Sequence, residues 1–213
     1  GKLPRFGRSK PERMGEPFWL AMIRGGANGY LAREKFEGGY HGPEMPAVWS
    51  FDRFGQSINE LPDGRIIEIA GEHEDYYDPD FHIYNDVVVH YPGGRIEVYG
   101  YPEEVFPPTD FHTATLVGEY LYLVGSVGYV GRRRYGETQV LRLHTGTLAM
   151  ERVETSGEGP GWLSRHKARY DGAGKLEVWG GQVCEMKEGE EVLTKNEGRW
   201  ELEIETGVWR RGG

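Results

Sequence analysis

From Val48 onward, short apolar runs alternate with turns rich in glycine and aspartate. Each run has about five to seven residues and many β-branched or aromatic side chains, which is typical of strands. Turn pairs such as Asp63-Gly64 and Asp171-Gly172 favour tight hairpins between neighbouring runs. The pattern therefore predicts an all-β fold. The runs that we interpret as strands lie within 64–71, 84–91, 94–101, 119–126, 138–144, 175–181 and 199–205.

The segment before these strands has a different pattern. Residues 14–46 contain Pro17, which suits the first turn of a helix, followed by an apolar side and a Gly-Gly stop. A second short helix is expected between Ala27 and Phe36. Helices of this length are unstable alone. We therefore expect a helical cap that packs on a β body formed by residues 47–213.

The first 13 residues form a third kind of segment. Residues 1–13 carry five basic side chains against one acidic side chain, with two prolines and two glycines. This composition predicts a flexible basic arm. A solvated terminus and an arm that docks on an acidic partner are both open interpretations.

Three segments of the β region resemble one another. Each contains a polar residue, a strand, a tight turn and an apolar strand that ends in glycine, and each is followed by a long polar loop and a second strand pair. The polar residues Gln56, His112 and His166 are 56 and 54 residues apart. This spacing predicts one four-stranded unit repeated three times. The repeated segments are 53–72, 110–127 and 164–183.

These units resemble Kelch-type repeats, which form the four-stranded blades of β-propellers. In that family the second strand ends in a glycine pair, the third begins with Asn-Asp-Val and the fourth tends to carry tryptophan. The resemblance covers residues 48–211 and implies Kelch-like blades. The residues that carry it are Gly180-Gly181, with altered copies at Ala70-Gly71 and Gly125-Ser126, then Tyr84-Asn85-Asp86-Val87, Arg165-His166 and Trp209.

Three blades are fewer than the four to eight that usually close a propeller. Two copies related by a two-fold axis would complete a six-bladed ring, so we expect a homodimer. The alternatives are a partial fourth blade that begins at residues 47–51, a chain that is half of a larger propeller, and a monomer whose faces are covered by the N-terminal helices.

Charge and apolar content exclude several partners. The formal net charge of −9 argues against nucleic-acid and anionic-membrane binding, since both favour a basic surface. No apolar run reaches the roughly 18–20 residues that span a bilayer. Cys184 is the only cysteine, so an internal disulfide and a multi-cysteine zinc site are impossible. With no signal peptide recognised, we expect a cytoplasmic protein.

The predicted topology places the long connections on one side of the blades. Because function concentrates on such loops, and because Kelch-type domains are mostly scaffolds, we expect a binding module for a protein partner or a small polar ligand. An enzyme acting on a small polar substrate is the alternative. The long connections are 71–86, 101–112, 125–138, 155–166 and 180–199.

The first long connection is rich in carboxylates and imidazoles. Such groups bind divalent Fe, Mn or Zn, so His73, Glu74, Asp78 and His82 are candidate metal ligands for a lyase or hydrolase. The spacing of the last three resembles the metal motif of plant Kelch-type specifier proteins. A solvated acidic loop with turn caps is the alternative, and no cofactor is otherwise expected.

His112 and His166 occupy equivalent positions at the start of the innermost strands, beside Asp110 and Arg165. Since histidine titrates near neutrality, the pair could bind a ligand or act as an acid and base at the mouth of the central channel. Alternatively, these side chains bond to neighbouring loops and hold the blades together.

The connection at 125–138 carries the basic run Arg132, Arg133 and Arg134. Arginine side chains bind carboxylates and phosphates, so the run could hold such a ligand. It could instead pair with an acidic loop of the next blade or of a partner chain, or simply face solvent. Trp162 lies on the same side and could stack on a sugar ring or pack between blades.

Overall fold

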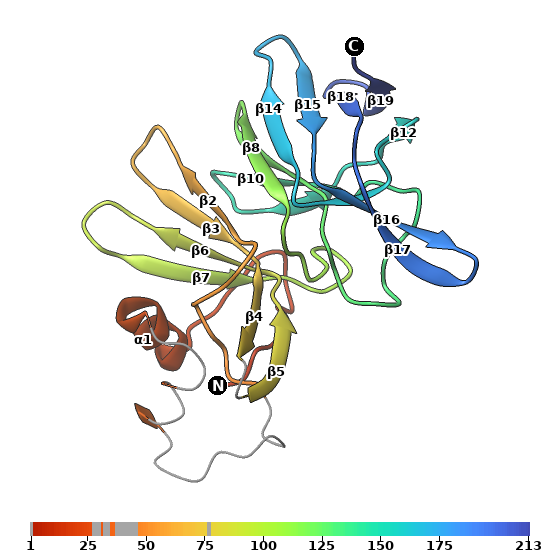
Figure 1. Cartoon of the computed structure of the whole chain (residues 1–213). Helices are drawn as coiled ribbons and strands as arrows, with labels where there is room; N and C mark the ends of the chain where they lie inside the picture. The colour runs from red at the N-terminus through yellow and green to blue at the C-terminus, as the bar shows by residue number, and fades with distance from the viewer. Residues whose placement is uncertain (1, 27–30, 32–34, 37–46, 76–77) are drawn as a thin grey trace. The chain divides into compact units, whose positions relative to one another are not determined.

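The computed structural model describes residues 2–26, 31, 35–36, 47–75 and 78–213. The chain forms two compact units, residues 1–108 and 109–213. Its sheets are almost entirely antiparallel and none is closed, and α1 is the one helix with defined bounds in the described part (Figure 1). The predicted all-β class is therefore confirmed. In the described residues, no helix is long and apolar enough to cross a membrane.

The first unit is built on one antiparallel sheet with the strand order β1-β7-β6-β3-β2. Strands β2, β3, β6 and β7 follow one another as a meander, and β1 adds to the outer edge. The long connection between β3 and β6 contains the hairpin β4–β5 (Figure 1). The strands are β1 (Glu12–Arg13), β2 (Ser57–Glu60), β3 (Ile66–Ile69), β4 (Glu72–Asp75), β5 (Asp78–Ile83), β6 (Asp86–His90) and β7 (Ile96–Gly100).

Helix α1 (Pro17–Gly25) covers one face of this sheet. Pro17 begins the helix, and Gly26, in the left-handed conformation, donates its N–H to the Met22 carbonyl and ends it. The Trp19 ring stacks on Trp49 with 4.9 Å between centroids, and the pair packs with Val88 and Val98 of the sheet. The cap expected here is present for α1. Most of the second helix expected at 27–36 lies outside the described residues.

The segment predicted as a flexible arm makes specific contacts in the structure. Strand β1 pairs with β7, and the Gly7 N–H donates to the Tyr101 carbonyl at 2.9 Å. A Cβ at residue 7 would collide with the Gly100 backbone, so glycine is required for this close approach. Residues 1–13 were predicted to be flexible because their sequence shows no alternation of apolar side chains. Backbone pairing of a strand does not require such an alternation.

The second unit contains two further meanders. Strands β8 to β11 form the first of them, and β14, β15, β18 and β19 form the other, with β12 pairing parallel to β19. The long connection between β15 and β18 holds the hairpin β16–β17, and β13 pairs with β16. The strands are β8 (Thr113–Val117), β9 (Tyr120–Val124), β10 (Val140–His144), β11 (Met150–Arg152), β12 (Ser156–Gly157), β13 (Trp162–Ser164), β14 (Lys167–Tyr170), β15 (Lys175–Trp179), β16 (Gln182–Lys187), β17 (Glu190–Lys195), β18 (Arg199–Glu203) and β19 (Val208–Arg211).

One apolar core joins the two meanders of the second unit. Val124 and Val140 of one meander pack with Val178, Leu202 and Trp209 of the other. All of these side chains are buried, so the apolar face of each meander is covered by the other meander of this unit.

A local feature recurs before the first strand of each meander. Gly55, Phe111 and Arg165 all have positive φ, at 63°, 47° and 56°. The residue before each of them bonds to the segment just after the second strand, through the Phe54–Glu72 bridge, the Val127 N–H donated to the Asp110 carbonyl, and the Ser164–Gln182 pair. The three predicted four-stranded units therefore share their backbone connection as well as their strand order.

Trp19→Ala tests the contribution of α1 to the first unit. Loss of a fully buried ring stacked on Trp49 should lower the free energy of unfolding by about 3–5 kcal/mol, measured by urea denaturation. Ile58→Ala is the control, because Ile58 is 62% exposed and its loss should change stability by at most about 0.5 kcal/mol. Equal effects of the two substitutions would contradict this packing.

Candidate functional site

A buried ion pair anchors the long connection of the first unit. The Asp86 carboxylate accepts hydrogen bonds from Arg53 Nη1 and Nη2 at 2.5 and 3.0 Å and from Trp49 Nε1 at 2.7 Å. The Arg53 guanidinium also stacks on the Tyr84 ring, with Cζ 3.4 Å from its centroid. A buried charge requires such pairing, so Asp86 of the Asn-Asp-Val motif fixes the end of this connection against the sheet.

A cavity of about 100 Å³ lies beside this ion pair, within the first unit. Arg5 and Phe6 of the N-terminal segment form part of its wall. The rest includes Trp49 and the residues that end the long connection, among them His82, Tyr84 and Asp86. The cavity therefore combines aromatic surface with a few polar groups, as ligand sites commonly do.

His82 is the polar group of this cavity that the protein leaves available. Its ring contacts the Tyr84 ring edge to face at 4.7 Å, and no hydrogen bond engages either ring nitrogen among the described residues. Burial, together with the nearby positive charge of Arg53 and against the opposing charge of Asp86, lowers the pKa of His82 to about 4. At neutral pH the ring is uncharged and offers one donor and one acceptor.

Two of the four predicted metal ligands face each other in the structure. His73 and His82 are directly opposite across the β4–β5 hairpin. His73 is buried and donates from Nδ1 to the Asp52 carbonyl at 2.7 Å, while Glu74 is exposed. The side chain of Asp78 lies outside what the structure describes. Within the described residues, no group of three histidine, cysteine or acidic side chains is arranged around one point, so metal binding stays a prediction.

The two histidines of the predicted pair lie near each other inside the second unit, before the adjacent strands β8 and β14. His166 Nε2 lies 2.9 Å from Thr113 Oγ1, and both histidines are buried at the starts of β8 and β14. Burial lowers the pKa of His112 to about 3, with a further contribution from His166, and burial lowers the pKa of His166 to about 4. Neither ring carries a charge at neutral pH. The contacts fit the alternative in which they hold neighbouring strands together.

Arg165 and Asp110, like the two histidines, make contacts that hold neighbouring segments of the protein together. Arg165 places its guanidinium over the Phe111 ring, with Cζ 3.3 Å from the centroid. The fully buried Asp110 carboxylate accepts from Ser126 Oγ at 3.0 Å and from the Gly128 N–H at 2.7 Å. Asp110 therefore fixes the start of the 125–138 connection.

The three consecutive arginines have different surroundings. Arg133 donates to the Val127 carbonyl at 2.8 Å and to Glu191 Oε2 at 2.6 Å, whereas Arg132 and Arg134 are largely solvent-facing. Glu191 belongs to β17, so Arg133 joins the 125–138 connection to the hairpin of the next meander. This arrangement matches the predicted alternative of pairing with a neighbouring acidic loop.

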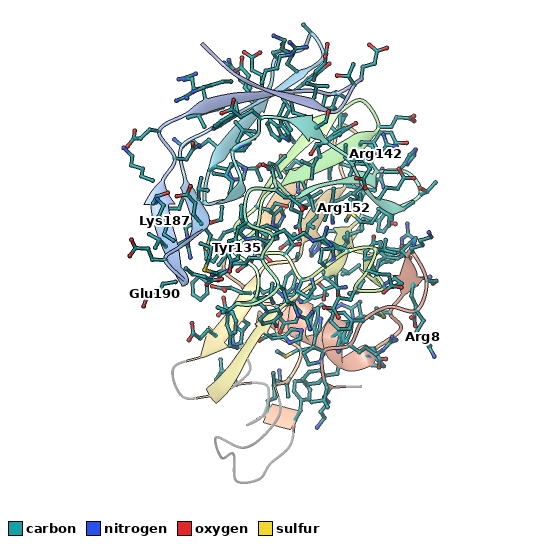
Figure 2. All side chains as sticks on the ribbon, turned by 90° about the vertical axis from the view of Figure 1, so that its right-hand side faces the viewer. Arg8, Tyr135, Arg142, Arg152, Lys187 and Glu190 are labelled. Atoms are coloured by element: carbon teal, nitrogen blue, oxygen red, sulfur yellow. The ribbon has the colours of Figure 1, made fainter. Side chains whose placement is uncertain are left out.

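Two aromatic side chains strengthen this junction. The Tyr135 hydroxyl donates to the other oxygen of Glu191, and Trp162 Nε1 donates to the Val127 carbonyl at 3.0 Å. Figure 2 labels Tyr135 together with Lys187 and Glu190, which lie where β16 turns into β17. Trp162 is buried, so packing is the interpretation that its surroundings support.

Sequence reasoning did not find Arg53, Trp49 and Phe6. Arg53 was noted only as the beginning of a repeat, and its partner Asp86 lies 33 residues away. Phe6 stands in the segment predicted as a free arm. The Asn-Asp-Val motif was the sequence signal for the ion pair, because it contains Asp86.

No family model matches the chain, and no curated protein matches it. The interpretation of the site therefore depends on its geometry and chemistry.

The histidine pair predicts a dependence of stability on acidity. Both folded pKa values lie below the ordinary value of about 6.5, so the unfolded chain binds more protons as the pH falls. Between pH 6.5 and about 4, each histidine should lower the free energy of unfolding by up to about 1.4 kcal/mol per pH unit. Urea denaturation at several pH values should show a shallower slope for His166→Gln. Ring signals of His112 and His166 that titrate near pH 6.5 in the folded protein would contradict the burial of these two side chains.

Glu191→Ala tests the junction of the second unit. It leaves the guanidinium of Arg133 buried without its carboxylate, which should cost about 1.5–3 kcal/mol of stability and expose the 125–138 connection. Trypsin should then cleave faster at Arg132 and Arg134. Glu190→Ala is the matched control, since Glu190 is exposed on the same strand. Equal cleavage rates in both variants would rule out the junction as the element that holds the loop.

Proposed function

We propose that the chain is a binding module built on Kelch-like β-propeller blades, which holds a partner protein through its long connections. Support comes from three four-stranded meanders in the predicted order and from the backbone feature repeated at Gly55, Phe111 and Arg165. Buried charges fix the long connections at Asp86 and Arg133, so these connections present defined surfaces. Location in the cytoplasm is part of the same proposal.

The observation that carries the proposal is the cavity at His82. Exposed aromatic side chains are common at protein interfaces, and here Phe6 is 40% exposed on the cavity wall while Phe81 is 44% exposed next to His82. The Arg53–Asp86 pair is neutral overall, and Arg5 already pairs with Glu12. A charged ligand would therefore lack a counter-ion inside the cavity.

An uncharged polar side chain of the partner fits these groups best. A carboxamide has one acceptor oxygen and an N–H donor, which complement the donor and acceptor of a neutral imidazole. The cavity volume suits a few heavy atoms rather than a whole metabolite. We therefore propose that the partner inserts an asparagine or glutamine side chain beside His82.

The burial of the two histidines in the second unit favours binding over acid–base catalysis. A general acid or base must reach the proton that it transfers and must titrate near the working pH. His112 and His166 are buried, and their pKa values lie near 3 and 4. These properties suit a structural contact.

Acetamide serves as the probe, because it is the side chain of asparagine without the backbone. Titration into the protein, followed by NMR, should shift the His82 ring signals with a dissociation constant of about 1 mM or weaker. His82→Phe should abolish the shift, since it keeps an aromatic ring against Tyr84 but removes both nitrogens.

Ile58→Ser is the control, because it changes an exposed side chain of β2 that is not part of the cavity wall. Acetate should bind more weakly than acetamide. No shift of His82, an equal shift in His82→Phe, or tighter binding of acetate would overturn the proposal. Proteins retained by the wild-type chain and by Ile58→Ser, but lost with His82→Phe, would be partners of this site.

A further inference from the structure

The hairpin β16–β17 ends its sheet with an open edge. The sheet order is β13-β16-β17, so β17 has a strand partner on one side only among the described residues. An edge strand presents a row of backbone N–H and C=O groups that another strand can pair with. Six consecutive residue pairs join β16 to β17 without a bulge, and β17 contains no proline. Two of the usual protections of an edge, a bulge and a proline, are therefore missing here.

Two exposed apolar side chains of this hairpin, Met186 and Leu193, lie on the same face. Cross-strand partners share a face, and the register pairs Cys184 with Leu193 and Met186 with Glu191. Leu193 is 56% exposed and Met186 is 46% exposed. Beside them, Glu191 is held by Arg133 and Tyr135. The edge thus combines exposed apolar surface with a fixed carboxylate.

The sequence of β17 is complementary to itself. Antiparallel pairing of two identical strands about a two-fold axis places one residue opposite its own copy. With Leu193 at the centre, the two leucines meet, Glu191 of each copy faces Lys195 of the other, and Val192 faces Thr194. With Val192 at the centre, Glu191 would face Leu193 and no opposite charges would meet. Charge complementarity therefore selects the first register.

We infer that β17 pairs with β17 of a second copy of the chain, which joins two three-stranded sheets into one continuous sheet. A carboxylate can accept several hydrogen bonds, so Glu191 can keep Arg133 and Tyr135 while it receives the second copy's lysine. The side chain of Lys195 is 75% exposed and contacts Glu197, an exposed pair that costs little to exchange. This surface lies in the second unit and is independent of the cavity at His82.

The outer face of the third meander, formed by β14, β15, β18 and β19, favours a dimer paired through β17 over a dimer that closes a six-bladed ring. The register of β14, β15 and β18 places Arg169, Glu177 and Glu201 in one row. Arg169 pairs with Glu177 at 2.5 Å, and Lys175 pairs with Glu201 at 2.7 Å. A ring would bury these ion pairs against another blade, at a large cost of desolvation. Pairing through β17 leaves them in water.

Lys195→Glu tests the inference in the full chain. Sedimentation equilibrium between about 1 and 100 µM should show a wild-type dimer, and the substitution should weaken it at least about tenfold, since two attractive pairs become repulsive. Lys187→Glu is the matched control on β16 and should leave the dimer unchanged. Urea denaturation should give both variants similar stability, because both lysines are largely exposed.

Hydrogen exchange supplies the second measurement. Amides of Glu191, Leu193 and Lys195, which alternate with those bonded to β16 and point to the open edge, should exchange more slowly as the concentration rises, and this effect should disappear in Lys195→Glu. A wild-type monomer over the whole range would overturn the inference. So would a dimer that Lys195→Glu leaves intact, or one that is weakened instead by Glu177→Lys on the outer face of the third meander.

Discussion

A charge removed from water must find a partner, and this constraint determines how the long connections of the chain are held. In the first unit, Arg53 and Asp86 satisfy each other beneath Tyr84, and the connection that carries β4 and β5 ends at this pair. In the second unit, Arg133 and Glu191 join two separate connections. Loss of one partner would leave the other buried and unpaired, which costs more than the pair itself contributes. The connection of the first unit is therefore anchored where it joins β6, and the two connections of the second unit are anchored to each other.

The strand pattern was accessible from the sequence because its cause is local. Apolar runs such as 119–126 alternate or are solidly β-branched. The polar residues Gln56, His112 and His166, which are 56 and 54 residues apart, stand just before the first strands of the three meanders. The hairpins inside the long connections escaped prediction because β4 reads Glu-His-Glu-Asp and β17 begins with two glutamates. Pairing there depends on backbone hydrogen bonds rather than on burial of one face.

The candidate site was partly accessible for a related reason. His82, His112 and His166 stood out by residue type, and the loop that contains His82 stood out by composition. Their protonation could not be read from the sequence, because burial lowers each pKa and burial depends on the packed fold. Arg53 and Asp86 belong to distant segments, so only the three-dimensional structure brings them together. The identity of the Kelch-like repeats stays a prediction from the glycine, Asn-Asp-Val and tryptophan positions.

The pairing of β1 with β7 has a consequence for how the first unit assembles. Glu12 lies opposite Gly100, so during synthesis β1 cannot pair with β7 until nearly ninety further residues have left the ribosome. Contacts of such long sequence separation slow folding, since the entropy of closing the intervening chain must be overcome first. The nascent segment, rich in lysine and arginine, stays accessible throughout that interval and docks only when the edge of β7 is complete.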